Sequence, residues 1–431
     1  MKIRLDPLRG MRDLVAPESE ELYYLKKKFS EVATRYGYEP IILPTLELFD
    51  LFSIKSGPEI KNSMYVFSDK RGRQVCLRPE FTAGVARAYL RLMRDKPKPI
   101  KLYYIGQAFR YEEPQAGRYR EFFQAGVEYL GDPSINADIE LLLLIRDYYK
   151  MVGLDNYKVK IGNIGIYRHL FSVWGIPEET QDLIIHYLDK KEVEKALSLV
   201  REYSASGQTL IEELMSISSS EPEEVKEQVS RLRLDSKSLE ELERTIKILE
   251  LSKKLGVGNS YVDLGFARGL AYYTGFIFEV TVPDVTFSIG GGGRYDKLIS
   301  LYGGEDLPAT GFALGLDRML LVLDNRGWQL PEKKVKVVLI ALVNYTVEVD
   351  QVATAFRNAG CVVDVRVVTK KKVGEVLGDA VERGYEYAVF LGEKEIREGT
   401  LTIKNLREKA QKTVKTDNLE EVLYELLRES K

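Results

Sequence analysis

Apolar residues recur every three or four positions between Pro17 and Gly37, which is the spacing of one face of a helix. Pro17 suits a first helical turn, and Gly37 ends the pattern. This segment therefore predicts an amphipathic helix with one buried face. The positions on that face are Leu22, Leu25, Phe29, Val32 and Tyr36.

Short runs rich in β-branched and aromatic residues predict strands in the next part of the chain. A polar segment separates the runs 101–109 and 121–130, which favours a hairpin with a long tip. After an interruption, two more runs, a glycine cluster and a helical segment at 314–323 continue the pattern. Strands mixed with helices in this way favour an α+β fold with an antiparallel sheet. The strand candidates are 38–43, 101–109, 121–130, 276–282 and 286–289.

Two stretches depart from this pattern. From 166 to about 256, helical spacing dominates and strand signals are few, which predicts a helical insertion. After a linker at 327–334, strands and helices alternate, a pattern typical of a small α/β domain with a largely parallel sheet. We therefore expect a first domain, 1–326, that carries the insertion, and a second domain, 335–431.

The length and composition agree with two domains. The chain has 431 residues, more than the roughly 250–300 at which a single core stops growing. Hydrophobic residues make up 45%, and no apolar run approaches the roughly 20 residues needed to span a bilayer. Residues 1–8 carry charges and lack the apolar stretch of a signal peptide. We therefore expect a cytoplasmic protein that does not associate with membranes.

Cysteine and histidine are scarce, which limits the chemistry available. Cys76 and Cys361 lie far apart, and the chain has two histidines, His169 and His186, so neither a zinc site nor a disulfide framework is expected. A catalytic triad that depends on histidine is equally unexpected. The net charge is -2, so a nucleic-acid partner would need a local basic surface.

A run of four glycines, 290–293, follows a predicted strand and leads into Arg294, Tyr295 and Asp296. It does not complete either the G-x-G-x-x-G or the G-x-x-x-x-G-K-[ST] fingerprint, so dinucleotide-binding and P-loop sites are excluded. Two interpretations stay open at this point. The glycines either permit a close backbone approach or touch a ligand.

The predicted hairpin carries the most informative chemistry. Arg110 lies on its first strand, and Arg118 and Arg120 lie at its tip. A guanidinium can bind a phosphate or a carboxylate through two parallel hydrogen bonds, although arginines at a tip can also be ordinary surface charges.

The second strand of the hairpin has a polar face. Gln124, Gly126 and Glu128 alternate along it and therefore share that face. A glycine between two long polar side chains leaves room for a polar ligand, but the same pattern also suits a solvated sheet.

Five motifs together resemble those of the class II aminoacyl-tRNA synthetases, and among these the histidyl-tRNA synthetase family. Residues 36–44 resemble motif 1, the F-R-x-E at 109–112 resembles motif 2, and 311–318 resemble motif 3. L-R-P-E-F-T at 77–82 is similar to the motif of the subgroup with C-terminal anticodon-binding domains. R-G-L-A-Y-Y at 268–273 is similar to the histidine-specific R-G-L-D-Y-Y. The resemblance covers nearly the whole chain.

The resemblance implies an activity. L-histidine would attack the α-phosphorus of ATP to give histidyl adenylate, and the 3' end of tRNA(His) would then take the histidyl group. It also implies Mg²⁺ bridging the phosphates mainly through water, a homodimer built on motif 1, and an anticodon-binding second domain. In that domain Lys370, Lys371 and Lys372 are candidate tRNA contacts, although the run taken alone can equally be a solvated loop.

The resemblance also implies residue roles. Arg110 would hold the α-phosphate and the substrate carboxylate, Arg268 the developing charge, and Arg318 the γ-phosphate, and these three are the expected catalytic residues. Such roles suit a reaction that needs placement and cationic stabilisation rather than a nucleophile. The expected ATP contacts are Arg110, Glu112, Arg118, Arg120 and Arg318. The expected histidine contacts are Glu80, Thr82, Arg110, Gln124, Glu128, Arg268, Tyr272 and Tyr273.

Three positions depart from the family pattern: Ala271, Asp317 and Phe123 stand where Asp, Glu and His are common. None of them removes an expected catalytic arginine. The alternative function is that of the synthetase-like regulatory subunit of ATP phosphoribosyltransferase, which usually lacks the second domain. A synthetase for proline, threonine or glycine shares the class motifs but does not explain 268–273.

Overall fold

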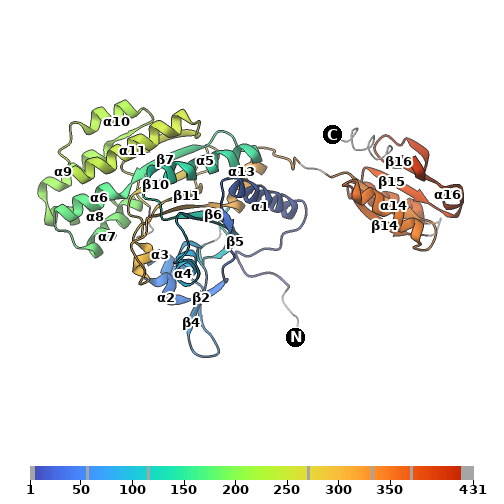
Figure 1. The fold of residues 1–431 in the computed structure, drawn as a ribbon, viewed down its shortest axis with the longest axis horizontal. Coiled ribbons are helices and arrows are strands. Elements are labelled where there is room, and N and C mark those ends of the chain that lie inside the picture. The colour runs from blue at the N-terminus through green and yellow to red at the C-terminus, as the bar shows by residue number, and fades with distance from the viewer. Residues whose placement is uncertain are drawn as a thin grey trace. The chain divides into compact units, whose positions relative to one another are not determined.

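The computed structural model describes residues 5–54, 58–113, 117–268, 272–331, 334–368 and 372–418, with the backbone alone at 58–60. The chain forms two compact units, which divide between Gln329 and Leu330. Each unit has its own sheet (Figure 1). Among the described residues, no helix combines the length and the apolar character needed to cross a membrane.

A nine-stranded sheet, in the order β1-β5-β6-β12-β11-β10-β7-β9-β8, organises the described part of the larger unit. The six middle strands pair antiparallel, as predicted, in the order β5, β6, β12, β11, β10 and β7. β1 pairs in parallel with β5, and β9 pairs in parallel with β7, so the sheet is mixed. Its strands are β1 (Glu39–Pro40), β5 (Ile100–Phe109), β6 (Glu121–Leu130), β7 (Lys158–Asn163), β8 (Ser218–Ser219), β9 (Asn259–Asp263), β10 (Phe276–Thr281), β11 (Ser288–Arg294) and β12 (Ala309–Gly315).

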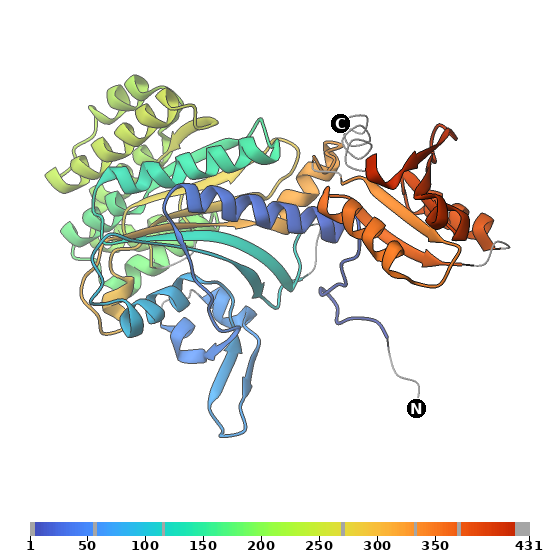
Figure 2. The ribbon, with the colours of Figure 1, turned by 45° about the vertical axis from the view of Figure 1, so that its right-hand side comes forward.

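Three helices cover one face of this sheet: α1 (Glu18–Arg35), α5 (Ile135–Val152) and α13 (Leu316–Asn325). Figure 2 shows α1 and α5 side by side above the strands. Phe29 of α1 joins the layers, because its ring centroid lies 5.2 Å from that of Tyr148 on α5 and 6.2 Å from that of Phe312 on β12. The predicted apolar face of α1 is buried as expected, except that Tyr36 lies just beyond the helix.

Two strand predictions need correction. Only Glu39–Pro40 of 38–43 forms a strand, an edge strand in which proline is tolerated, and the Ile41 amide makes one further bond to Tyr103 O of β5 at 2.9 Å. The glycine run 290–293 lies inside β11 and does not follow the strand. Glycine suits this place because a Cβ on Gly292 would overlap the Gly311 carbonyl of the neighbouring strand.

A small three-stranded sheet and several helices also belong to the larger unit. Its strands lie in the order β2-β4-β3, and β3 and β4 extend away from the main sheet (Figure 2). These elements are β2 (Leu46–Leu48), β3 (Val66–Ser68), β4 (Gln74–Leu77), α2 (Phe49–Ser53), α3 (Pro58–Ser63), α4 (Thr82–Leu92) and α12 (Leu298–Leu301).

Helices α6 to α11 form the predicted insertion. Asn163 ties it to the main sheet, because its side chain caps α6 at Gly165 and donates to Thr245 of α11 at 3.0 Å. The helices are α6 (Ile164–Val173), α7 (Glu178–Asp189), α8 (Val193–Tyr203), α9 (Ala205–Ser216), α10 (Pro222–Val229) and α11 (Ser236–Lys254).

The smaller unit has the predicted α/β alternation. Its strand order is β14-β13-β15-β16-β17, with the first three parallel and the last two antiparallel. Lys372 is exposed before α15, whereas Lys370 and Lys371 lie outside the described residues. Its elements are β13 (Lys336–Ala341), α14 (Val347–Asn358), β14 (Val362–Val367), α15 (Val373–Glu382), β15 (Tyr387–Leu391), α16 (Glu393–Glu398), β16 (Thr400–Asn405), β17 (Gln411–Lys415) and the 3₁₀ turn η2 (Thr416–Asn418).

Candidate active site

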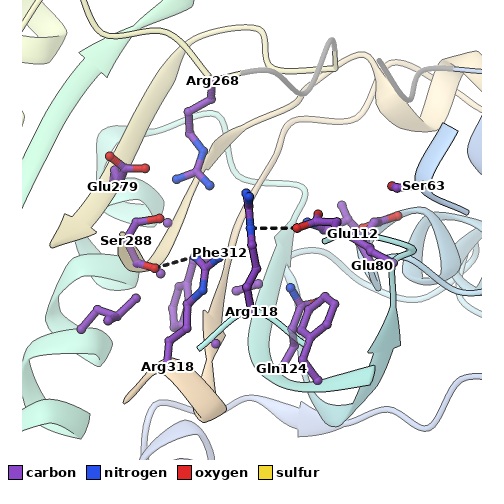
Figure 3. Close-up of a pocket in the computed structure, with 18 of the residues that line it drawn as sticks. Ser63, Glu80, Glu112, Arg118, Gln124, Arg268, Glu279, Ser288, Phe312 and Arg318 are labelled. Carbon is purple, nitrogen blue, oxygen red and sulfur yellow. Dashed lines mark hydrogen bonds and ion pairs between the residues drawn. The ribbon is translucent and has the colours of Figure 1, made fainter. Parts of the chain in front are cut away.

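A cleft of about 770 Å³ opens over β6, β10, β11 and β12 of the larger unit. Figure 3 shows Arg268, Arg118 and Arg318 extending into it from different elements. The hairpin tip, the start of α4 and the end of α7 supply the remaining walls. Predicted residues that line the cleft are Glu80, Thr82, Arg110, Glu112, Arg118, Gln124, Arg268, Tyr272, Tyr273 and Arg318.

The three predicted catalytic arginines are held by main-chain carbonyl oxygens. A carbonyl orients a guanidinium but carries no formal charge, so the positive charge remains available to an anionic ligand. A guanidinium has five N–H groups, so donors remain after these bonds are made. The bonds are Arg110 Nε to Pro79 O at 3.0 Å, Arg268 Nη1 to Phe278 O at 2.8 Å and Arg318 Nη1 to Ser288 O at 2.8 Å, the last drawn in Figure 3.

Gly291 makes room for Arg268. A Cβ built on this glycine would overlap Arg268 Nη1 and would lie 2.7 Å from the Phe278 carbonyl oxygen to which Nη1 donates. The absence of a side chain therefore lets the guanidinium lie against β11. Of the two interpretations of the glycine run, close approach explains this position.

Arg118 differs from the other cleft arginines because it is paired with a carboxylate. Its Nε lies 2.8 Å from Glu112 Oε2, and its side chain is 49% exposed (Figure 3). Burial, followed by the positive charge of Arg118, lowers the pKa of Arg318. Arg318 therefore lies near a second cation, and an anion bound between the two would relieve their repulsion.

Arg120 is not brought to the cleft. Its guanidinium lies 3.7 Å from the Tyr111 ring centroid and Nε donates to Glu112 O at 3.0 Å, so the side chain is buried behind the tip. These contacts hold the tip in place. We therefore do not retain Arg120 as an ATP contact.

Glu80 and Gln124 present oxygen atoms to the same cleft. Glu80 accepts from the amides of Thr82 at 2.5 Å and Ala83 at 3.0 Å, and so caps the first turn of α4. Each carboxylate oxygen can accept a further hydrogen bond. Gln124 Oε1 is buried and has no hydrogen-bond partner within the described part of the chain, which marks it as a ligand acceptor.

Glu128 lies behind the cleft wall and is 1% exposed. Its two oxygens accept from Thr82 Oγ1 at 2.7 Å and from the Tyr295 hydroxyl. Burial raises the pKa of Glu128 to about 8, against the hydrogen bonds from Tyr295 and Thr82, which lower it. Glu128 is therefore a buried acceptor in contact with two residues that line the cleft.

Sequence reasoning missed Tyr104 and Tyr295. The space expected above Gly126 is filled by Tyr104, since a Cβ on Gly126 would overlap the Tyr104 hydroxyl. The pairing of Tyr104 with Gly126 across β5 and β6 was readable from the hairpin once its register was known. Tyr295 directly follows the glycine run, which was the available signal.

The helical insertion also supplies residues to the cleft. His186 and Asp189 at the end of α7, and Lys190 directly after it, line the cleft. The sequence favoured a structural role for His186. No local sequence pattern indicates that α7 lies beside the cleft.

Comparison with known proteins follows the same division of the chain. The family model described as histidyl-tRNA synthetase matches residues 10–319, and the anticodon binding domain model matches 336–426. A histidine–tRNA ligase of Sulfolobus acidocaldarius is 42% identical over 430 residues, covering 97% of this chain and 98% of that protein. The histidine–tRNA ligase of Sulfurisphaera tokodaii is 38% identical, covering 99% of this chain and all of its own length.

Solved structures share the fold. Histidyl-tRNA synthetase from Nostoc sp. PCC 7120 superimposes with a TM-score of 0.79 at 22% identity, covering 98% of this chain and 99% of that chain. An ATP phosphoribosyltransferase regulatory subunit/histidyl-tRNA synthetase from Bacillus halodurans gives 0.76 at 25% identity, covering 91% and 99%.

The raised pKa of Glu128 predicts a pH-dependent stability. In the unfolded chain this carboxyl ionises near 4.5, whereas the folded protein keeps it protonated to about pH 8. Stability from Glu128 is therefore full below about pH 4.5 and is lost as the pH rises to about 8. We expect the Tm of the parent, relative to that of Glu128→Gln, to fall across this window and then to level. A Tm difference that stays constant between about pH 5 and pH 9 would contradict the assignment.

Proposed function

This chain belongs to the histidyl-tRNA synthetase family, and we propose that its cleft performs the family's reaction through three arginines held by main-chain carbonyls. The chain is an ATP-dependent ligase that activates L-histidine as histidyl adenylate and transfers it to the 3' end of tRNA(His). The main support for the proposal is that main-chain carbonyls orient these arginines and leave their positive charge available. Phosphoryl chemistry without a protein nucleophile depends on such placement and charge stabilisation.

The phosphates of ATP occupy the arginine end of the cleft in this proposal. Arg110 binds the α-phosphate and the carboxylate of histidine, Arg318 binds the γ-phosphate, and Arg268 stabilises charge that develops at the α-phosphorus. Their fixed positions support in-line attack by the carboxylate. Pyrophosphate leaves with the electrons of the broken P–O bond.

ATP separates Arg118 from Glu112 in the same proposal. The ion pair is half-exposed, so its replacement by stronger contacts to the nucleotide costs little. Arg118 then binds phosphate, and Glu112 is freed to accept from the adenine amino group.

Histidine occupies the part of the cleft lined by Glu80, Thr82 and Gln124 in this proposal. Glu80 and Gln124 Oε1 accept from its ammonium group, which suits the unpartnered amide oxygen. Glu128 accepts from one imidazole nitrogen, with Thr82, Tyr272 and Tyr273 completing the pocket. A side chain that could not donate to Glu128, as the Thr82 and Tyr295 hydroxyls do in the free protein, would be disfavoured, which gives selectivity for imidazole.

We propose that Mg²⁺ accompanies ATP and is held mainly by phosphates and water. The described residues contain no cluster of three or more acidic, histidine or cysteine side chains that could cage a metal. Glu279 nevertheless lines the cleft and would offer the oxygen donors that Mg²⁺ prefers. Mg²⁺ held there would supply positive charge to the phosphates.

The regulatory-subunit alternative has less support. The Bacillus halodurans protein is named for both roles, so the fold alone does not separate the two functions. The anticodon binding domain at 336–426 and the carbonyl-held arginines favour the synthetase.

Arg268→Ala tests the catalytic proposal. We expect histidine-dependent pyrophosphate exchange to fall by roughly 10² or more, mainly in kcat, because one preorganised charge stabiliser is removed. Gly291→Ala should lower kcat by roughly tenfold or more, because the added methyl displaces the guanidinium.

A double-mutant cycle supplies the control for this prediction. If Gly291 acts through Arg268, Gly291→Ala adds little loss of exchange in an Arg268→Ala background. Gly378→Ala, where a Cβ meets open space, should leave exchange unchanged. Near-parental exchange by Arg268→Ala would refute the catalytic role.

The smaller unit is proposed to bind the anticodon region of tRNA(His) through backbone, unstacked-base and local basic contacts, including exposed Lys372. Lys370 and Lys371 remain candidates outside the described residues. Deleting the chain from 332 onward should spare much of the pyrophosphate exchange but severely depress tRNA charging, with thermal unfolding as the check on folding. Charging by the full chain should weaken steeply with salt, since phosphate contacts release counterions. Undiminished charging by the truncated chain at limiting tRNA would contradict this role.

We propose a homodimer that buries the exposed apolar surface around motif 1 and the small sheet. Ile42 is 97% exposed, and Leu46, Leu48, Val66 and Phe67 are 40–50% exposed. Light scattering should give twice the 49.2 kDa mass, and Ile42→Asp should weaken both association and activity. A fully active parent of 49.2 kDa at micromolar concentration would contradict it.

A cytoplasmic location is proposed for the same protein. Cys76 and Cys361 are buried and carry free thiols, which suits a reducing compartment.

A further inference from the structure

Asp317, one of the departures from the family pattern, joins motif 3 to motif 2. It lies in the first turn of α13, directly before Arg318, and its side chain is 3% exposed. Its Oδ2 accepts from the backbone N–H of Phe123 on β6 at 2.5 Å. The pairing of β12 with β6 ends one residue earlier, at Gly315 and Gln124. Asp317 therefore extends the ladder with a side-chain carboxylate in place of the next carbonyl.

Arg12, from the segment before α1, completes this junction. Its Nη2 donates to Asp317 Oδ1 at 2.5 Å across 305 residues of sequence, and its Nη1 donates to Glu18 at 2.7 Å. Burial raises the pKa of Asp317, whereas the Phe123 amide and Arg12 lower it. The buried carboxylate thus depends on Arg12 for a cationic partner.

The same guanidinium also touches the hairpin tip. Its central carbon lies 3.7 Å from the ring centroid of Tyr119, the residue after Arg118, and Tyr119 lines the cleft. Nearby, the Arg120 amide donates to Gly10 O at 2.7 Å. Arg12 therefore joins the tip that carries Arg118 to the helix turn that carries Arg318.

Phe123, a second departure from the family pattern, lies in this junction. Lys26 of α1 places its ammonium 3.4 Å from the Phe123 ring centroid. Asp317 and Phe123 thus contact each other, and each also contacts a basic residue from the N-terminal part of the chain, Arg12 for Asp317 and Lys26 for Phe123. The site is supported from behind by cations that do not enter the cleft.

We propose that Arg12 is a positioning residue for ATP, which acts by holding the motif 2 tip and the first turn of α13 in one arrangement. Arg12 does not line the cleft, so its effect is transmitted through Tyr119 and Asp317. The inference rests on the proposed role of Arg318 as a phosphate contact. The side-chain contacts described for Arg12 are to Tyr119, Asp317 and Glu18, and not to the segments that carry Glu80, Thr82 and Tyr273, so the loss of Arg12 affects ATP more than histidine.

The test is the KM of each substrate in pyrophosphate exchange. Arg12→Ala should raise the KM for ATP by roughly tenfold, because small misplacements of binding groups are costly, and should change the KM for histidine by less than about twofold. Arg12→Lys keeps the charge but loses the planar contact with Tyr119, so its KM for ATP should be intermediate. In an Asp317→Ala background, Arg12→Ala should add less than its effect in the parent.

Arg9→Ala is the matched control. Arg9 lies on the same segment and pairs with Glu113, but both side chains are more than 70% exposed, so both KM values should stay at the parent level. Arg318→Ala, measured in parallel, separates the two proposals. If it leaves the KM for ATP unchanged, the proposed role of Arg318 fails.

If Arg318→Ala raises the KM for ATP and Arg12→Ala does not, the inference about Arg12 is wrong. An equal rise in both KM values for Arg12→Ala would also overturn it, since that result indicates general loss of structure. Should Arg12→Ala fail to fold, Arg12→Lys decides by the same selectivity for ATP.

Discussion

Three arginine side chains in the cleft are oriented by main-chain carbonyl oxygens, and the rest of the active site depends on that arrangement. A carboxylate would hold a guanidinium more strongly but would cancel the charge that the phosphates need. Carbonyls of β10, of the residue that opens β11 and of the segment before α4 instead fix direction and leave the charge available. Arg118, the exception among the described cleft arginines, is paired with Glu112, and we propose that it exchanges partners when ATP binds.

The sheet supplies more than those carbonyls. Gly291 leaves the space in which Arg268 lies, and Tyr295, at the end of the same strand segment, donates to the buried Glu128. Asp317 extends the β6 ladder and so sets the start of the helix that presents Arg318. Strand register therefore places these groups around the cleft, where we propose that the arginines bind phosphate and the acceptors bind histidine.

Much of this was accessible from the sequence. Periodicity gave α1, the β5–β6 hairpin, the insertion and the alternating second unit, and the motif resemblance gave ten of the residues that line the cleft. Local patterns could not reveal that the glycine run lies inside β11, because a strand of glycines has no apolar alternation. Local patterns also could not reveal that Tyr104 fills the space above Gly126, because that depends on the cross-strand register. Nor could they reveal the Arg12–Asp317 contact, which joins residues 305 positions apart in the sequence.

The central claim is that geometry, and not charge alone, makes these arginines effective. Pyrophosphate exchange by Arg268→Lys tests it most directly, because lysine keeps the positive charge but cannot donate to the Phe278 carbonyl and to a phosphate with the same planar fork. The account predicts a kcat close to that of Arg268→Ala, with the folded state preserved. A lysine variant whose kcat stays within about threefold of the parent, a difference of only roughly 0.65 kcal/mol in the barrier, would contradict it.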